Sequence, residues 1–194
     1  MNERHRCRSI RLRGYDYREA GAYFVTICTA NRECFFGEIV DEAMQLNRLG
    51  EIVQDEWHRT AIVRPQVSLD AFVVMPNHIH GIISFDAQEE GKARLAPTTA
   101  RFGYPIAGSL PSILGAFKSA CTNRINLARQ TPGLPLWQRN YYEHVVRSES
   151  ELARVREYIA MNPARWEEDS ENPNQIGNPQ GDVALQKIFD ERVV

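Results

Sequence analysis

Two histidines, His78 and His80, lie one residue apart at the start of a β-branched, apolar run, His78–Phe85. Side chains two positions apart on a strand point to the same face, so both imidazoles converge while Ile79 packs on the other side. Two neutral imidazoles on one face suit a divalent metal ion. The alternative is a pair of polar surface histidines or of hydrogen-bonded core histidines.

A second pair, Tyr158 and Asn162, lies near the end of a segment with helical periodicity. Residues four apart stack on one face of a helix, and the amide of Asn162, just before Pro163, is available as a cap or as an oxygen ligand. A tyrosine hydroxyl has a pKa of about 10, so its use as a nucleophile requires nearby positive charge or a metal that polarises the electrophile. The alternative is that Tyr158 packs beside Val155 and Ile159 while Asn162 only ends the helix.

The hydrophobic pattern predicts one α/β domain with a largely antiparallel sheet to position these pairs. Strands are expected at Ala22–Ala30, Val67–Met75 and His78–Phe85. The last two are separated only by Pro76 and Asn77, which predicts a hairpin. Helices are expected over Asn47–Ala61, from an N-cap at Ser109 to Ala128, and after Ser148, which has capping-box spacing to Glu151.

Composition sets broad limits on the class of protein. The chain has 194 residues, 43% hydrophobic and 25% charged, which excludes a fully disordered or collagen-like chain. No apolar run approaches the ~20 residues of a membrane span, and the N-terminus lacks the apolar stretch of a signal peptide. Four cysteines without a C-x-x-C pair are typical of reduced thiols, so we expect a cytoplasmic protein with no membrane partner.

The formal net charge of −2 hides a strong asymmetry along the chain. Residues 1–14 hold five arginines and one acid, residues 101–147 six basic residues and one acid, and residues 167–194 seven acids and two basic residues. The basic stretches are compatible with a polyanion-binding face; a solvated surface with segregated charge is the alternative. We expect a basic arm at 1–14, a domain at 15–166 with a mobile insertion at 86–107, and an acidic tail at 167–194.

Three segments resemble the single-tyrosine HUH transposases and, among them, the REP-associated tyrosine transposases. They are FVVMPNHIHGII at Phe72–Ile83, WQRNYYEHVVR at Trp137–Arg147 and REYIAMNPARW at Arg156–Trp166. The resemblance covers roughly residues 10–166. It implies an α+β, ferredoxin-like sandwich in which an antiparallel sheet carries the HUH motif and helices pack on one face.

The same resemblance implies roles for the two pairs of residues. His78 and His80 would be metal ligands for Mg²⁺ or Mn²⁺, Asn162 would supply a third contact, and Tyr158 would be the catalytic nucleophile. The activity would be cleavage and rejoining of single-stranded DNA through a 5′-phosphotyrosine intermediate, with the metal polarising the scissile phosphate.

The family's substrates are REP-type palindromes that fold as hairpins with a flanking tetranucleotide, so hairpin-forming single-stranded DNA is the expected partner. Basic side chains would follow the phosphates and aromatic rings would stack on unpaired bases. The residues expected to bind DNA are Arg4, Arg6, Arg8, Arg11, Arg13, Lys118, Arg124, Arg139, Tyr141, Tyr142 and Arg147.

His144 is a lesser candidate metal ligand, and the alternative is a hydrogen-bonded structural histidine. The resemblance leaves open whether the protein is a monomer or a homodimer.

Two other functions are compatible with the same residues. A ferredoxin-like sheet with aromatic side chains can bind single-stranded nucleic acid without catalysis, and His78 and His80 would then be polar surface residues. A metal-dependent phosphodiester hydrolase would use the histidine pair to activate water, and Tyr158 would then be structural. A replication or relaxase enzyme is a third candidate, against which the short chain weighs.

Overall fold

The computed structural model describes residues 21–85, 107–175 and 188–189. The expected basic arm, residues 86–106 of the expected insertion and most of the acidic tail lie outside these residues. The strands are β1 (Gly21–Cys28), β2 (Gly37–Val40), β3 (Ala43–Leu46), β4 (Val67–Val74), β5 (His78–Phe85) and β6 (Tyr142–Val146). The α-helices are α1 (Arg48–Ile62), α2 (Leu110–Arg129) and α3 (Glu149–Met161), and the 3₁₀ helices are η1 (Ala30–Arg32) and η2 (Pro163–Glu168).

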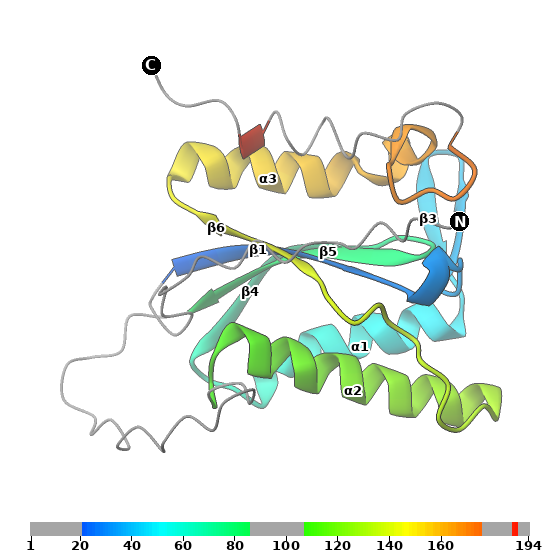
Figure 1. Ribbon diagram of the computed structural model, residues 1–194. Coiled ribbons are helices and arrows are strands. Elements are labelled where there is room, and N and C mark those ends of the chain that lie inside the picture. The colour runs from blue at the N-terminus through cyan, green and yellow to red at the C-terminus, as the bar shows by residue number, and fades with distance from the viewer. Residues whose placement is uncertain (1–20, 86–106, 176–187, 190–194) are drawn as a thin grey trace, which may run out of the picture.

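Four strands form one antiparallel sheet in the order β4-β5-β1-β6 (Figure 1). Helix α1 precedes β4, and α2 connects β5 to β6, which is the arrangement of a ferredoxin-like sandwich. The predicted α+β, ferredoxin-like fold is therefore confirmed, and the predicted hairpin is the β4–β5 pair. The HUH motif occupies β5, an interior strand of the sheet.

A small second sheet, β2 paired with β3, lies between β1 and α1 in the chain, where no strand was predicted. Its turn residues, Asp41 and Glu42, adopt positive φ angles of 48° and 61°, which match the twist of a two-residue hairpin. Such a turn is usually marked by Asn-Gly or Asp-Gly. Because Asp-Glu carries no such signal, the hairpin is not evident from the sequence.

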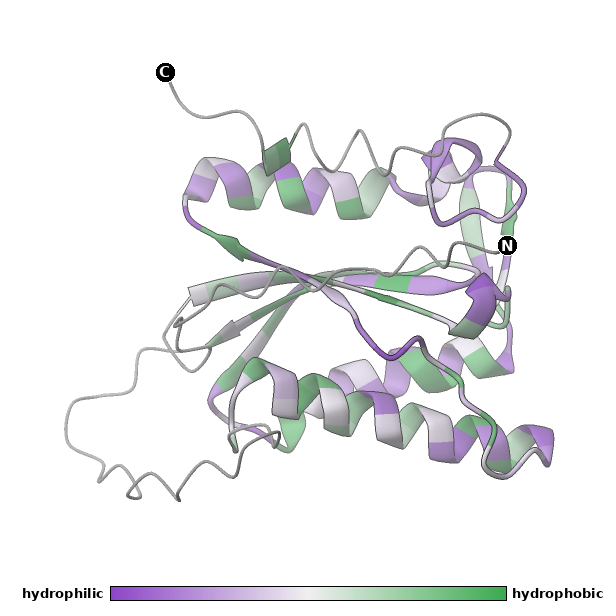
Figure 2. Cartoon of the chain, in the orientation of Figure 1, coloured by the Kyte–Doolittle hydropathy of each residue, from purple (hydrophilic) through white to green (hydrophobic). Residues whose placement is uncertain are grey.

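The helices cover both faces of the main sheet (Figure 1). Helices α1 and α2 share one face, but α3 packs on the other, so the prediction that the helices pack on one face is wrong for α3, whose apolar stripe covers Phe24 and Ile82 on the second face of the sheet. On β1, Tyr23, Val25 and Ile27 belong to the apolar cluster under α1 and α2, whereas Phe24 belongs to the cluster under α3. Colouring by hydropathy alternates along α1 and α2, as it does for helices with one face on a sheet (Figure 2).

Helix α1 approaches the sheet closely at Gly81 of β5. A β-carbon at this position would lie 2.4 Å from Cζ2 of Trp57 on α1. The Trp57 ring in turn stacks on Phe72 of β4, with 4.6 Å between centroids. Glycine therefore lets the largest buried ring of the core lie directly against the strand that carries both histidines.

We expect Gly81→Ala to lower the free energy of unfolding by roughly 1–3 kcal/mol, because the added methyl group must displace Trp57 or shift β5. Gly115→Ala on α2 is the matched control: a β-carbon there meets nothing within 4 Å. It should raise stability by about 0.5–1 kcal/mol through helix propensity. Urea denaturation followed by tryptophan fluorescence measures both, and equal midpoints for the two variants would contradict the packing argument.

Candidate metal and nucleophile site

The side chains of His78 and His80 leave β5 on the face covered by α3, and both are almost fully buried. Their Nε2 atoms are 3.0 Å apart. Ile79, between them, packs in the cluster on the opposite face. The two-residue period of the strand thus brings both imidazoles to one point.

Hydrogen bonds behind each ring determine which nitrogen faces that point. Nδ1 of His78 is 2.9 Å from Oδ1 of Asn77, and Nδ1 of His80 is 2.8 Å from the hydroxyl of Thr26 on β1. With each Nδ1–H donating to its oxygen, both Nε2 atoms present lone pairs to each other. This is the tautomer that imidazole needs to coordinate a metal through Nε2.

Burial keeps both rings neutral. It lowers the pKa of His80 from 6.5 to about 3. The pKa of His78 also lies well below 6.5, chiefly because of burial, with repulsion from His80 and Arg32 adding to the effect. Two nitrogen ligands at ~2.1 Å from one ion and 90° apart would be separated by about 3.0 Å, which is the separation found. The pair therefore fits one metal ion.

Asp169 is the carboxylate of this cluster, which the sequence analysis did not identify. Its Oδ2 lies 3.5 Å from Nε2 of His78, and the ligand atoms of His78, His80 and Asp169 all lie within 4.8 Å of one another. Asp169 follows η2, in the segment expected to be a tail. It is the third of three consecutive acidic residues, so no spacing distinguished it from Glu167 and Glu168.

Asn162, the predicted third contact, also reaches the cluster. It is the C-cap of α3 and is 4% exposed, and its side chain lies against His78, where it acts to raise the pKa of that ring. Its buried Oδ1 makes no well-formed hydrogen bond. A buried amide oxygen with a carboxylate and two imidazoles is a donor set that suits a divalent ion such as Mg²⁺ or Mn²⁺.

Tyr158 lies on the same side of α3, and its hydroxyl is 3.4 Å from Nε2 of His80. The ring packs edge-on against Phe24, with centroids 6.0 Å apart, in the cluster that also holds Val155 and Ile159. The four-residue spacing thus places Tyr158 and Asn162 over the same histidine pair. The packing expected as the alternative role of Tyr158 is present together with the contact to His80.

Helix α3 is capped at its start and tied to the sheet farther along. Ser148 accepts from the Glu151 N–H at 3.1 Å, as the capping-box spacing predicted, and the Glu151 carboxylate accepts from the N–H of Arg147, one residue before the cap, at 2.7 Å. Farther along the helix, Arg156 donates to Asp70 of β4 at 2.7 Å and lowers the pKa of that carboxyl. The candidate nucleophile Tyr158 therefore lies on a helix that is capped at its start and tied to β4 through Arg156.

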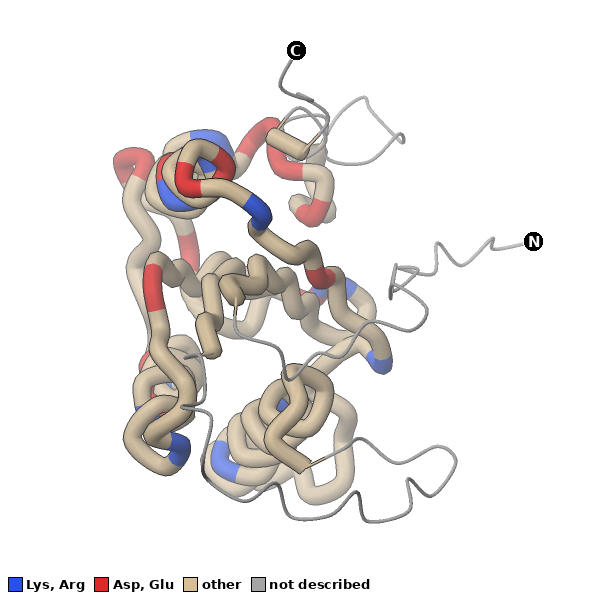
Figure 3. The backbone as a smooth tube through the Cα atoms, turned by 90° about the vertical axis from the view of Figure 1, so that its left-hand side faces the viewer, with Lys and Arg blue, Asp and Glu red and all other residues tan. Residues whose placement is uncertain are grey.

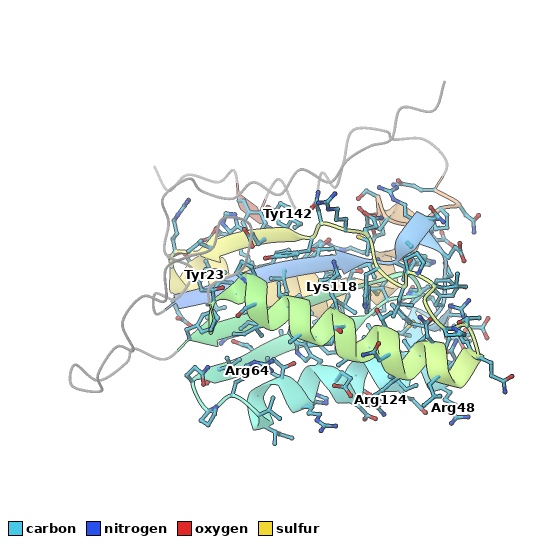
Figure 4. All side chains as sticks on the ribbon, turned by 60° about the horizontal axis from the view of Figure 1, so that its bottom comes forward. Tyr23, Arg48, Arg64, Lys118, Arg124 and Tyr142 are labelled. Carbon is cyan, nitrogen blue, oxygen red and sulfur yellow. The ribbon has the colours of Figure 1, made fainter. Side chains whose placement is uncertain are left out.

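Of the residues expected to bind DNA, Lys118 and Arg124 lie on α2, on the face of the sheet opposite the histidines (Figure 4). Lys118 donates to the carbonyl oxygen of Gln138 at 2.7 Å. Arg124 pairs with Glu56 of α1 at 2.7 Å. Both cations join segments of the chain, and neither reaches the histidine pair.

The other expected DNA contacts are divided between surface and core. Arg139 and Arg147 are exposed, and Tyr142, on β6, is partly buried against Phe24. Tyr141 belongs to the core under α1 and α2. The arginines of the N-terminal arm, Arg4, Arg6, Arg8, Arg11 and Arg13, lie outside the described residues. Basic positions among the described residues occur on both helical layers rather than on one face (Figure 3).

His144 does not join the cluster. Its Nε2 is 2.8 Å from a carboxylate oxygen of Glu151, and its ring stacks on Phe189 with centroids 3.7 Å apart. This is the hydrogen-bonded structural histidine that the sequence analysis gave as the alternative to a ligand.

The chain is similar to known proteins in sequence and in fold. An uncharacterised protein of Haemophilus influenzae is 44% identical over 169 residues, which cover 85% of this chain and 92% of that protein. The solved structure of a REP-associated tyrosine transposase bound to a REP hairpin superposes with a TM-score of 0.54 at 20% identity, covering 80% of this chain and 73% of that one. A suspected transposase from Deinococcus radiodurans R1 matches at 22% identity over 77% of this chain and 95% of its own, with a TM-score of 0.38. No protein-family model matches the chain.

Within the described residues, no helix has the length and apolar character to span a bilayer. The described cysteines Cys28, Cys34 and Cys121 form no disulfide.

We expect His78→Ala to weaken Mn²⁺ binding by at least about 100-fold, because it removes one of two nitrogen ligands. Isothermal titration calorimetry of the metal-free protein measures this. His58→Ala is the matched control, since His58 is exposed on α1 and lies on the other side of the sheet. Equal Mn²⁺ affinity of both variants would show that the metal binds elsewhere.

Proposed function

We propose a transposase activity for this chain, which belongs to the same family as the Haemophilus influenzae protein and has the fold of the REP-associated tyrosine transposases. In this proposal the protein is a metal-dependent endonuclease that cleaves and rejoins single-stranded, hairpin-forming DNA in the cytoplasm. Tyr158 is its catalytic residue, and a 5′-phosphotyrosine is its intermediate.

The observation that carries the proposal is the position of the Tyr158 hydroxyl, 3.4 Å from Nε2 of His80. A tyrosine is a useful nucleophile only beside a group that offsets negative charge on the reacting phosphate. His78, His80, Asp169 and Asn162 would hold Mg²⁺ or Mn²⁺ beside it. When bound, that ion supplies the positive charge that polarises the scissile phosphate.

The chemistry of the chain itself is a transesterification. The Tyr158 oxygen loses its proton and forms a bond to phosphorus, while the bond from phosphorus to the 3′ oxygen breaks and that oxygen takes up a proton. One phosphodiester is exchanged for another, so the reverse attack by a 3′-hydroxyl rejoins the strands without a nucleotide cofactor. The packing of Tyr158 against Phe24 holds the phenol in place for attack.

The substrate is proposed from the structural neighbour, which is a transposase bound to a REP hairpin. In this chain, the exposed residues Arg139 and Arg147 are available for phosphates, whereas Tyr142 is partly buried and packs against Phe24 and Phe189. Lys118 and Arg124 are excluded from the strand-cleavage site by their place on the opposite face. Tyr158 and His80 belong to one chain, so a monomer holds the nucleophile and the metal ligands together.

We expect Tyr158→Phe to abolish the covalent protein–DNA adduct and to lower strand cleavage by at least about 10³-fold, because it removes the attacking oxygen. The measurement is a denaturing gel of protein incubated with Mn²⁺ and an end-labelled single-stranded REP-type hairpin. Tyr23→Phe is the matched control, since Tyr23 is buried under α1 and α2 and its loss should leave the adduct in place.

Each other outcome favours a different function. Cleavage without an adduct, unchanged in Tyr158→Phe, would contradict the nucleophile and favour a hydrolase. A shift of the hairpin on a native gel with no cleavage by either protein, across a panel of hairpins, would favour a binding module. Equal cleavage of blunt duplex and hairpin would contradict the single-stranded substrate.

A further inference from the structure

Asn77, the residue before the histidine motif, is fully buried, and its side chain joins three segments of the chain. Its Oδ1 lies 2.9 Å from Nδ1 of His78 on β5. Its Nδ2 donates to the carbonyl oxygen of Arg32 in η1 at 3.1 Å and to that of Glu171, after η2, at 2.6 Å. The two donor hydrogens and the oxygen of the amide are all in use.

We propose that Asn77 is a positioning residue for the metal site, a proposal that rests on the metal-binding function proposed above. It acts in two ways. It holds the proton of His78 on Nδ1, and it anchors the turn that presents Asp169 to the histidine pair.

The first role follows from the orientation of the amide. A carbonyl oxygen can only accept, so the contacts of Nδ2 with two carbonyls identify that atom as the nitrogen. Oδ1 must then face His78, and an amide oxygen can only accept the Nδ1 proton. The amide cannot flip without placing its oxygen against two carbonyl oxygens. His78 is therefore held in the tautomer whose Nε2 lone pair faces His80.

The second role runs through Glu171. Its carbonyl oxygen accepts from Asn77, and its N–H donates to Oδ1 of Asp169 at 2.7 Å. This bond turns Oδ2 of Asp169 toward His78, 3.5 Å away. Arg32 supports the same turn by donating to the carbonyl oxygen of Ser170 at 2.9 Å and by pairing with the Glu171 carboxylate at 3.1 Å. Asn77 and Arg32 together hold the turn 169–171 against the start of β5.

Two variants distinguish the two roles of Asn77. Asn77→Ala removes both, whereas Arg32→Gln removes the second support of the turn but keeps the Arg32 carbonyl and the bond from Asn77 to His78. We expect Mn²⁺ affinity to fall about 10- to 100-fold in each variant, as it does when partners of metal ligands are removed. Only Asn77→Ala should change the tautomer of His78.

The experiment combines two measurements. Isothermal titration calorimetry gives the Mn²⁺ affinity, and two-bond ¹H–¹⁵N correlation spectra of the metal-free protein show which nitrogen of His78 carries the proton. Asn126→Ala is the matched control. Asn126 is a buried asparagine of α2 that donates to the Leu134 carbonyl oxygen at 2.8 Å, and its loss should leave affinity and tautomer unchanged. Circular dichroism confirms that each variant is folded.

A wild-type affinity and a single Nδ1–H tautomer in Asn77→Ala would overturn the proposal. A wild-type affinity in both Arg32→Gln and Asn77→Ala would overturn the role in holding Asp169, whatever the tautomer of His78. If Asn77→Ala does not fold, Arg32→Gln still tests whether the turn 169–171 supports metal binding. The spectrum of the wild-type protein then tests the first role, which is overturned if His78 carries its proton anywhere but on Nδ1. Failure of the wild type to bind Mn²⁺ would instead contradict the metal site itself, while the metal-free spectra continue to test Asn77.

Discussion

Two imidazole nitrogens with lone pairs directed at each other, 3.0 Å apart, repel one another unless a proton or a cation lies between them. In water the rings would rotate apart. Here the strand fixes their spacing, Thr26 and Asn77 fix their faces, and burial disfavours a charged ring. Much of the α3 side of the molecule holds these two nitrogens together, and a positive ion between them would stabilise the contact.

The residues that meet at this point come from distant parts of the sequence. Thr26 belongs to the first strand, the histidines to an interior strand, Tyr158 and Asn162 to the last long helix and Asp169 to the turn beyond it. The ferredoxin-like order places β1 beside β5, and α3 crosses the face that the other two helices leave open. The fold therefore forms the site directly, because the same strand order that builds the sheet brings the histidine nitrogens and the oxygen donors together.

The parts of the site that could be predicted from the sequence are those set by local periodicity. A two-residue period placed His78 and His80 on one face, and a four-residue period placed Tyr158 and Asn162 on one side of a helix. Asp169 could not be found in this way, since its position depends on a turn held by Asn77 and Arg32. The sequence also did not show that Lys118 and Arg124 join segments of the chain on the face opposite the histidines, and their expected role in DNA binding stays a prediction.

The contact between Gly81 and Trp57 has a consequence for how the site can change. Trp57 lies directly against β5 and leaves the strand no room to move toward α1. The packing of the core therefore fixes the positions of the two imidazoles on that side. An adjustment of the histidine geometry would require repacking of α1. The buried apolar cluster under α3 is smaller than the one under α1 and α2. Differences in reactivity between related chains can therefore arise more easily on that side, through the tyrosine and the oxygen donors, while the two histidines stay in place.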